Sequence, residues 1–249
     1  MKDDIIYGRN PVIEALEAGK TTIDKLLMQD GLRHSQLGHI HHLAKEKGLR
    51  CQTVDKRKLD QLCGNQNHQG VIALTAVHAY AEISDMLALA KRRNEPPFLV
   101  ITEGITDPHN LGSIIRTANA AGAHGVIIPK NRSAGLNATV AKVSAGAVEY
   151  TMVARVTNIA QTVRKLKEDG LWIVGTDLSG TQPHDACDLT GPLGIVIGSE
   201  GEGMSRLVRQ SCDFLVKIPM VGEIESLNAS VAAGILLYEA VRQRRQEEK

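Results

Sequence analysis

Alternating hydrophobic and polar positions divide the first part of this 249-residue chain into short strands and amphipathic helices. The pattern predicts strands at 4–7, 23–28, 51–54 and 70–76. It predicts helices at 35–47 and 56–63, and Asn10 and Pro11 are typical of the start of another helix. These elements indicate a small α/β domain.

A second, clearer alternation of strands and helices begins near residue 98. The expected strands are 98–101, 125–128, 149–153, 171–176, 193–198 and 214–218. The expected helices are 111–121, 138–143, 159–168, 204–210 and 230–243. Strands that alternate with helices favour a parallel sheet covered by helices on both faces.

The segment between these two patterns has the character of a connection. A helix is expected at 81–91, a charged run follows at 91–95, and Pro96 and Pro97 end it. We therefore expect a first domain at 1–77, a linker at 78–96 and a second domain at 97–249.

Composition excludes several classes of protein. The longest apolar run, 229–237, is far too short to span a bilayer, and the acidic N-terminus is unlike a signal peptide. Four scattered cysteines without a CxxC pair indicate a reducing cytoplasm rather than a disulfide framework or a zinc site. His39, His41 and His42 lie near Glu46, but their spacing favours a polar helix face over a metal site. We expect neither a metal nor a membrane.

Charge is informative only locally. The net charge is +1, yet 108–148 holds no acid while it carries Arg116, Lys130, Arg132 and Lys142. Such a segment predicts a surface for a polyanion, although a solvated helix face is the alternative. Aromatic residues make up only 3% of the chain, so any RNA would be bound through its shape, phosphates and polar groups rather than by stacking.

Three polar segments follow expected strands, where ligands bind in open parallel sheets. In the first, 107–116, Asn110 and Arg116 lie six residues apart at the start of a helix. Arg116 stands among Ile114, Ile115 and Ala118, which is not an obvious place for a surface residue. A structural arginine held in an ion pair is the alternative.

The second segment is a glycine-rich turn, Gly198–Gly203, which matches neither a dinucleotide fingerprint nor a phosphate loop. Its acids Glu200 and Glu202 favour a ligand with hydrogen-bond donors or positive charge, although glycines are often needed only for their backbone angles. The third segment, 218–230, holds Glu225, Ser226 and Asn228 just before the last helix. One of these groups could simply cap that helix.

Together the three segments resemble the SpoU/TrmH family of RNA ribose 2'-O-methyltransferases, in the SPOUT class. Asn110-x-Gly112-x-x-x-Arg116 is similar to the first family motif, and Gly198-Ser199-Glu200-Gly201-x-Gly203 to the second. The third motif resembles Ile218-Pro219-Met220 followed by Glu225-Ser226-Leu227-Asn228-x-Ser230. All three motifs occur in the family's order.

The resemblance implies a fold, a cofactor and a set of site residues. It implies a parallel-sheet domain with a deep trefoil knot, S-adenosylmethionine bound in that knot, and a homodimer with the active site near the interface. It assigns phosphate handling and activation of the hydroxyl to Arg116, with orienting roles for Asn110, Glu200, Ser226 and Asn228. Its cofactor pocket would be formed by Thr176, Gly198, Ile218, Met220 and Leu227.

The N-terminal stretch resembles the substrate-binding domain of the family's ribosomal RNA branch, a small domain similar to a ribosomal protein. The matching residues are Tyr7–Val12 and His68–Val71. The implied substrate is a guanosine ribose in the peptidyl-transferase loop of 23S rRNA, free or in a ribosomal precursor. Phosphate contacts would come from Arg9 and from the run Lys56, Arg57 and Lys58, for which a solvated helix start is the alternative.

Three alternatives stay open at this point. The same chemistry could act on tRNA, since related enzymes share the two-domain plan. The chain could be a knotted RNA-binding module without catalysis, which the intact motif residues oppose. A nucleotide-dependent oxidoreductase is opposed by the missing GxGxxG fingerprint.

Overall fold

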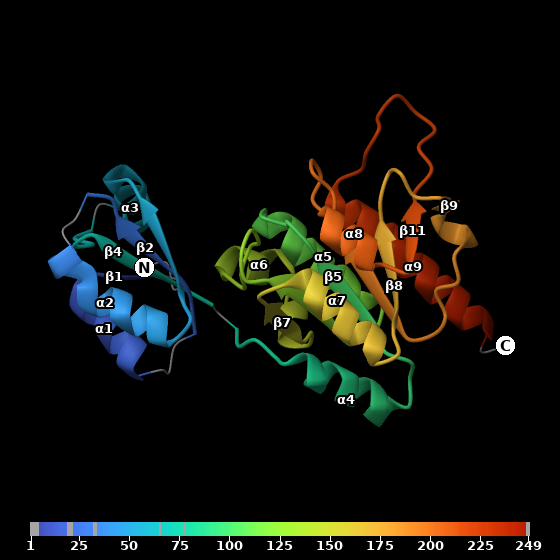
Figure 1. The fold of residues 1–249 in the computed structure, drawn as a ribbon, viewed down its shortest axis with the longest axis horizontal. Coiled ribbons are helices and arrows are strands. Elements are labelled where there is room, and N and C mark those ends of the chain that lie inside the picture. Colours follow the sequence, from blue (N-terminus) through green and yellow to red (C-terminus); the bar gives the residue numbers. More distant parts are fainter. Residues whose placement is uncertain (1–4, 19–21, 32–33, 65, 77, 248–249) are drawn as a thin grey trace. The chain divides into compact units, whose positions relative to one another are not determined.

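A computed structural model describes residues 5–18, 22–31, 34–64, 66–76 and 78–247 (Figure 1). The acidic N-terminal residues 1–4 lie outside this part of the chain. The chain forms two compact units, one made mainly by residues 1–79 and the other by most of residues 80–249.

The first unit is built on a four-stranded mixed sheet. Its strands are β1 (Ile5–Tyr7), β2 (Ile23–Gln29), β3 (Arg50–Val54) and β4 (Val71–Thr75), in the order β1-β4-β2-β3. Strand β2 is parallel to β3, and β4 is antiparallel to both of its neighbours.

Helices α1 (Arg9–Ala18) and α2 (His34–Glu46) pack on one face of this sheet, and α3 (Lys56–Cys63) packs on the other. Successive strand residues point to opposite faces. Leu26 therefore joins the core beneath α1 and α2, while Leu27 joins Leu59 and Ile72 beneath α3. This confirms the small α/β domain expected from the pattern.

The second unit contains a seven-stranded sheet in which every paired strand is parallel. Its strand order is β7-β6-β5-β10-β8-β11-β9. The bounds are β5 (Phe98–Thr102), β6 (Gly125–Pro129), β7 (Val153–Val156), β8 (Trp172–Thr176), β9 (Gln182–Pro183), β10 (Leu193–Ile197) and β11 (Phe214–Lys217). The central strands β5 and β10 are buried along their whole length, as expected for a sheet covered on both faces.

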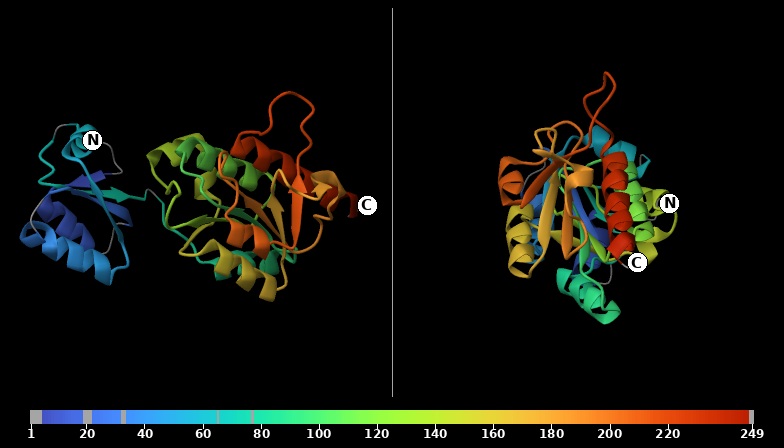
Figure 2. Two further views of the ribbon diagram at one scale, coloured as in Figure 1. Left: turned by 45° about the horizontal axis from the view of Figure 1, so that its top comes forward. Right: turned by 90° about the vertical axis from the view of Figure 1, so that its right-hand side faces the viewer.

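Helices cover both faces of this sheet (Figure 2). On one face, α4 (Ile83–Arg93), α7 (Ile159–Glu168) and α8 (Arg206–Ser211) surround a shared core. On the other face, α5 (Pro108–Ala120) packs along α9 (Ala229–Glu247). A short helix α6 (Ala138–Val143) and two 3-10 turns, η1 (Ala147–Glu149) and η2 (His184–Ala186), complete the unit.

Two expectations from the sequence differ from the structure. The strand expected at 149–153 begins only at Val153, where pairing with β6 starts, because the Thr151 hydroxyl donates to Ala147 O within a turn. The helix expected at 81–91 is present as α4, but it does not lie in a linker, because its Met86 and Ala90 are fully buried. Met86 lies in the core shared with α7, so the second unit starts near Tyr80.

No helix in the described part of the chain is both long and apolar enough to cross a membrane. Within the same residues, no group of three or more His, Cys, Asp or Glu side chains gathers as metal ligands do. His42 instead pairs with Glu46 at 3.3 Å on the exposed surface of α2.

Candidate active site

The loops that follow β8, β10 and β11 enclose a cavity of about 330 Å³ at the carboxyl ends of these strands. Ligands of parallel sheets bind at this end. Apolar side chains such as Ile197 and Val216 form part of its wall, and acids from the turn after β10 form another part. All the residues assigned to the cofactor pocket line it, namely Thr176, Gly198, Ile218, Met220 and Leu227.

The glycine-rich turn needs its first glycine for a close approach of the backbone. A Cβ atom on Gly198 would lie 2.5 Å from the carbonyl carbon of Gly203 and 2.7 Å from Met204 N. The turn is closed by two backbone hydrogen bonds, from Ser199 N to Gly203 O at 3.2 Å and from Gly203 N to Ser199 O at 3.0 Å. Only glycine at position 198 allows this shape.

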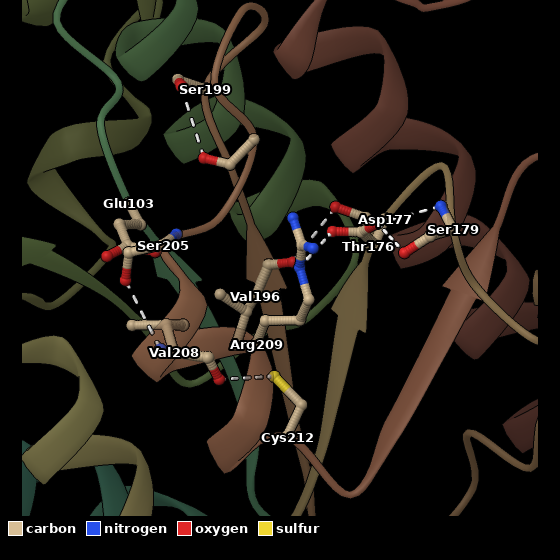
Figure 3. A network of polar contacts seen from close by, with 11 residues as sticks. Glu103, Thr176, Asp177, Ser179, Val196, Ser199, Ser205, Val208, Arg209 and Cys212 are labelled. Carbon is tan, nitrogen blue, oxygen red and sulfur yellow. Dashed lines mark hydrogen bonds and ion pairs between the residues drawn. The ribbon is translucent and has the colours of Figure 1, made fainter.

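An ion pair in the cavity wall joins the loop after β8 to α8 (Figure 3). Asp177 Oδ2 lies 2.8 Å from Arg209 Nε, while Asp177 Oδ1 accepts from Ser179 N at 2.9 Å and from its hydroxyl at 2.5 Å. The sequence pattern offers Asp177 only as a loop residue. Its position directly after a buried strand is the signal that could have placed it at this site.

Three residues from the three motif segments meet in one hydrogen-bonded cluster. Asn110 Nδ2 donates to Glu200 Oε1 at 3.0 Å, and Asn228 Nδ2 donates to Asn110 Oδ1 at 2.8 Å. Asn228 Nδ2 also lies 2.5 Å from Glu200 Oε1. Residues 118 positions apart in the chain are thus held side by side.

The same cluster organises the start of α9. Asn228 Oδ1 accepts from Ser230 N at 3.0 Å, from the Ser230 hydroxyl at 2.6 Å and from Val231 N at 3.3 Å. Glu200 Oε1 accepts from Ala229 N at 3.2 Å. A carboxylate at a helix N-terminus is stabilised by the helix dipole. Asn228 therefore caps the helix, as the alternative from the sequence held. The same side chain also joins the cluster with Asn110 and Glu200.

Arg116 and Ser226 do not join this cluster. Arg116 is exposed on α5, and within the described residues it makes neither a hydrogen bond nor an ion pair. Its apolar neighbours in sequence therefore do not bury it, and no described residue holds it in the ion pair that was the alternative. Ser226 is exposed as well and lines the cavity instead.

The other basic residues of the acid-free segment are also exposed. Lys130 and Arg132 follow β6, and Lys142 lies in α6. Arg132 adopts a φ of 54°, a left-handed conformation that a side chain rarely takes. These positive charges face solvent, where an anionic partner can reach them.

Comparison with known proteins identifies the family. The model of the SpoU rRNA Methylase family matches residues 97–238, and the model for RNA 2'-O ribose methyltransferase substrate binding matches residues 5–81. The chain belongs to the SpoU/TrmH family of RNA methyltransferases. The first of these matches contains the entire cavity and the Asn110–Glu200–Asn228 cluster.

Relatives match over nearly the full length. The Bacillus subtilis protein YacO, assigned by name to the TrmH family of tRNA/rRNA methyltransferases, is 50% identical over 241 residues, covering 97% of this chain and 96% of its own. A Staphylococcus haemolyticus protein with the same family name is 50% identical over 246 residues, covering 99% and 98%.

Solved structures share the fold. The SpoU methyltransferase AviRb from Streptomyces viridochromogenes, in complex with the cofactor AdoMet, superposes with a TM-score of 0.61 at 28% identity. That match covers 97% of this chain and 90% of AviRb. The TrmH/SpoU tRNA modifying enzyme of A. aeolicus matches 66% of this chain and 86% of its own, with a TM-score of 0.57 at 30% identity.

Proposed function

We propose that this protein transfers a methyl group from S-adenosylmethionine to the ribose 2'-hydroxyl of a guanosine in the peptidyl-transferase loop of 23S rRNA. The observation that carries this proposal is the convergence of Asn110, Glu200 and Asn228 beside one cavity. The motif residues and the stretches Tyr7–Val12 and His68–Val71 resemble those of the 23S rRNA guanosine-2'-O-methyltransferase RlmB, which is the basis for this choice of substrate.

The residues around the cavity fit S-adenosylmethionine. Ile218, Met220 and Leu227 offer apolar surface for an adenine ring, and Gly198 lines the cavity with backbone groups that can hydrogen-bond to a ligand. Glu200 and Glu202 place negative charge beside a ligand that carries a sulfonium and an ammonium group. The volume lies in the range of small-molecule sites.

S-adenosylmethionine, when bound, supplies an electrophilic methyl group. The protein's part is to hold the ribose hydroxyl in line and to manage its proton. Every hydrogen bond that Glu200 accepts from a described residue ends on its Oε1 atom. Its Oε2 atom is therefore available to accept from a substrate hydroxyl. Asn110 and Asn228 fix the position of that carboxylate, and Ser226 is available on the cavity wall to orient the ribose.

Arg116 is the residue that we assign to the substrate phosphate. A guanidinium keeps its proton in proteins, so its role is to bind the phosphate next to the reacting ribose and to stabilise negative charge on the hydroxyl oxygen. Its exposure on α5 supports this role, because a phosphate can reach it from solvent.

We further propose that the enzyme acts as a homodimer whose active sites lie near the interface. Arg116 on α5 and the exposed apolar residues Val231 and Tyr238 on the neighbouring α9 support this arrangement. The loops after β8, β10 and β11 are the segments that would form the trefoil knot, and their meeting at one cavity supports it.

The four cysteines are free, in keeping with an enzyme that acts on RNA in the cytoplasm.

The N-terminal unit is assigned to selection of the RNA. Arg9, Lys56 and Lys58 lie on or near the starts of α1 and α3 and would contact phosphates, together with Arg57.

A methyl-transfer assay tests the function. The protein is incubated with labelled S-adenosylmethionine and either a transcript of 23S rRNA domain V or a tRNA pool, and the label is mapped by mass spectrometry. We expect 2'-O-methylguanosine in the peptidyl-transferase loop. Label only in tRNA would overturn the substrate and keep the chemistry. Absence of label from both RNAs and from ribosomal precursor particles, with the cofactor still bound, would identify a binding module.

A further inference from the structure

A second polar cavity, of about 440 Å³, lies within the N-terminal unit at the starts of α1 and α3 and the loop before β4. Its side chains are mainly carboxamides and positive charges, beside one carboxylate and one imidazole: Gln29, Gln66, Asn67 and Gln69, Arg9 and Lys56, Asp60, and His68. None of its described lining residues is Phe, Tyr or Trp. A ligand here is therefore recognised by hydrogen bonds and charge rather than by stacking.

A buried histidine fixes the shape of this cavity. His68 is only 4% exposed, and its Nδ1 accepts from Gly70 N at 2.9 Å. Because Nδ1 is the acceptor, Nε2 carries the proton and donates to Asp60 Oδ1 at 3.0 Å. Gln69, which lies between His68 and Gly70 in the chain, is held at a φ of 49°, in the left-handed region that a glutamine rarely adopts.

This constrained loop in turn positions an arginine. Gln69 Oε1 accepts from Arg9 N at 2.9 Å, and Gln69 O accepts from Arg9 Nε at 3.2 Å. Among the described residues, the two Nη groups of Arg9 make no hydrogen bond. The guanidinium is thus oriented while its outer donors stay free for an anionic ligand.

We propose that this cavity binds a single unpaired nucleotide of the RNA substrate. Gln66 and Asn67 read the edge of its base, since a carboxamide offers one acceptor and two donors, and Arg9 and Lys56 pair with the flanking phosphates. This inference rests on the proposed function, because it takes RNA to be the substrate.

The ligand is expected to be unpaired for a geometric reason. Base edges in the deep major groove of an RNA helix are out of reach of side chains, whereas a nucleotide splayed out of a loop can enter a concave site. The cavity has the size of a small-molecule pocket, and its carboxamides supply the donors and acceptors that a base edge requires.

Paired substitutions in the full-length protein test the proposal, with the 23S rRNA domain V transcript as the probe. Gln66→Ala removes a carboxamide from the cavity, and Gln61→Ala removes one from an exposed position of α3 outside it. Gln66→Ala should raise the dissociation constant about fivefold or more, the usual effect of losing one base contact, and Gln61→Ala should leave it unchanged.

The salt dependence separates the two kinds of contact. Lys56→Gln should weaken binding and lower the slope of log K against log salt by about one, while Gln66→Ala should leave the slope unchanged. Lys45→Gln, which removes an exposed charge from α2, is the matched control. Equal thermal midpoints would show that all four variants fold.

The outcomes are distinct from those of the function assay. Retained binding by Gln66→Ala, or an equal loss on a fully paired RNA of the same length, would overturn the nucleotide pocket even if the wild-type protein methylates the transcript. Binding that depends on Gln66 and Lys56 without any methyl transfer would uphold the pocket and count against the enzyme. Failure of the wild-type protein to bind the transcript would overturn both.

Discussion

At the scale of single residues, Arg116 shows how a helix turns residues that are neighbours in sequence toward different surroundings. Its neighbours Ile114, Ile115 and Ala118 form the buried face of α5. Arg116 is turned away from that face by the 3.6-residue period, and so it faces solvent. An arginine that no structural partner holds is available to the substrate.

Arg116→Ala should therefore remove activity and leave the fold intact. We expect methyl transfer to fall at least about a hundredfold, as it does when one charge-stabilising donor is lost from an active site. Cofactor binding, measured by calorimetry, should be unchanged because Arg116 does not line the cavity. Arg164→Ala, an exposed arginine of α7 on the opposite face of the sheet, serves as the control. Loss of cofactor binding in a folded Arg116→Ala protein would contradict this division of roles.

His124 makes the stability of the second unit depend on pH. It is 2% exposed; its Nδ1 accepts from Phe98 N at 3.0 Å, and Nε2 lies 3.1 Å from Glu95 Oε2. Burial lowers the pKa of His124 below 6.5, against the opposing effect of Glu95. The unfolded chain then takes up the proton first, so stability is full above pH 6.5 and is lost as the pH falls below it.

The free energy of unfolding in urea, measured between pH 7.5 and 5.5, should show this dependence of stability on pH. The wild-type value should decrease toward low pH, by at most about 1.4 kcal/mol per pH unit from this group. In His124→Asn, an amide oxygen can replace Nδ1 as the acceptor but cannot titrate. A variant with the same pH slope as the wild type would show that His124 is not the cause.

At the scale of elements, the turn between β10 and α8 depends on backbone contact rather than on side chains. A Cβ on Gly198 would lie within 2.8 Å of three backbone atoms, whereas a Cβ on Gly201, in the same turn, would meet no atom within 4 Å. Backbone cannot move aside as a flexible side chain can. Gly198→Ala must therefore open the turn that carries Glu200.

This contrast gives a matched pair of variants. Gly198→Ala should lower the thermal midpoint by several degrees, a loss of about 1–3 kcal/mol typical of overpacking. It should also weaken the binding of S-adenosylmethionine more than tenfold. Gly201→Ala should melt like the wild-type protein. Equal midpoints for the two variants would show that the turn tolerates the extra carbon.

At the scale of the whole molecule, α9 presents an exposed apolar face. Val231 and Tyr238 are 50% and 52% exposed, and a spacing of seven residues places them on one side of the helix. The helix packs on α5, which carries Arg116. A second copy of the chain covering this face would bring the active sites close to the interface.

Sedimentation tests this arrangement. The wild-type protein should sediment with twice the 26.9 kDa mass of one chain. The double variant Val231→Glu, Tyr238→Glu should be monomeric, because burying two carboxylates in an apolar interface is costly. Leu207→Glu, at a 62%-exposed position of α8, should remain dimeric. A wild-type protein of single-chain mass would contradict the homodimer.

Sequence alone was enough to predict the alternation of elements, the parallel sheet and the family. Apolar runs such as 193–197, bounded by turn residues, indicated buried strands, and the motifs that hold Asn110, Glu200 and Asn228 pointed to the family before any contact was known. These are local properties, since the periodicity and the chemistry of a short segment are written in its own residues.

Only the tertiary structure decided which distant groups meet. It placed α4 on the core through Met86, because that side chain fills the space left by Gly125, and no local pattern reports such a fit. It joined Asp177 to Arg209 across 32 positions of sequence, and it left Arg116 exposed. Packing and pairing between remote segments depend on the whole chain, so they become visible only once it is folded.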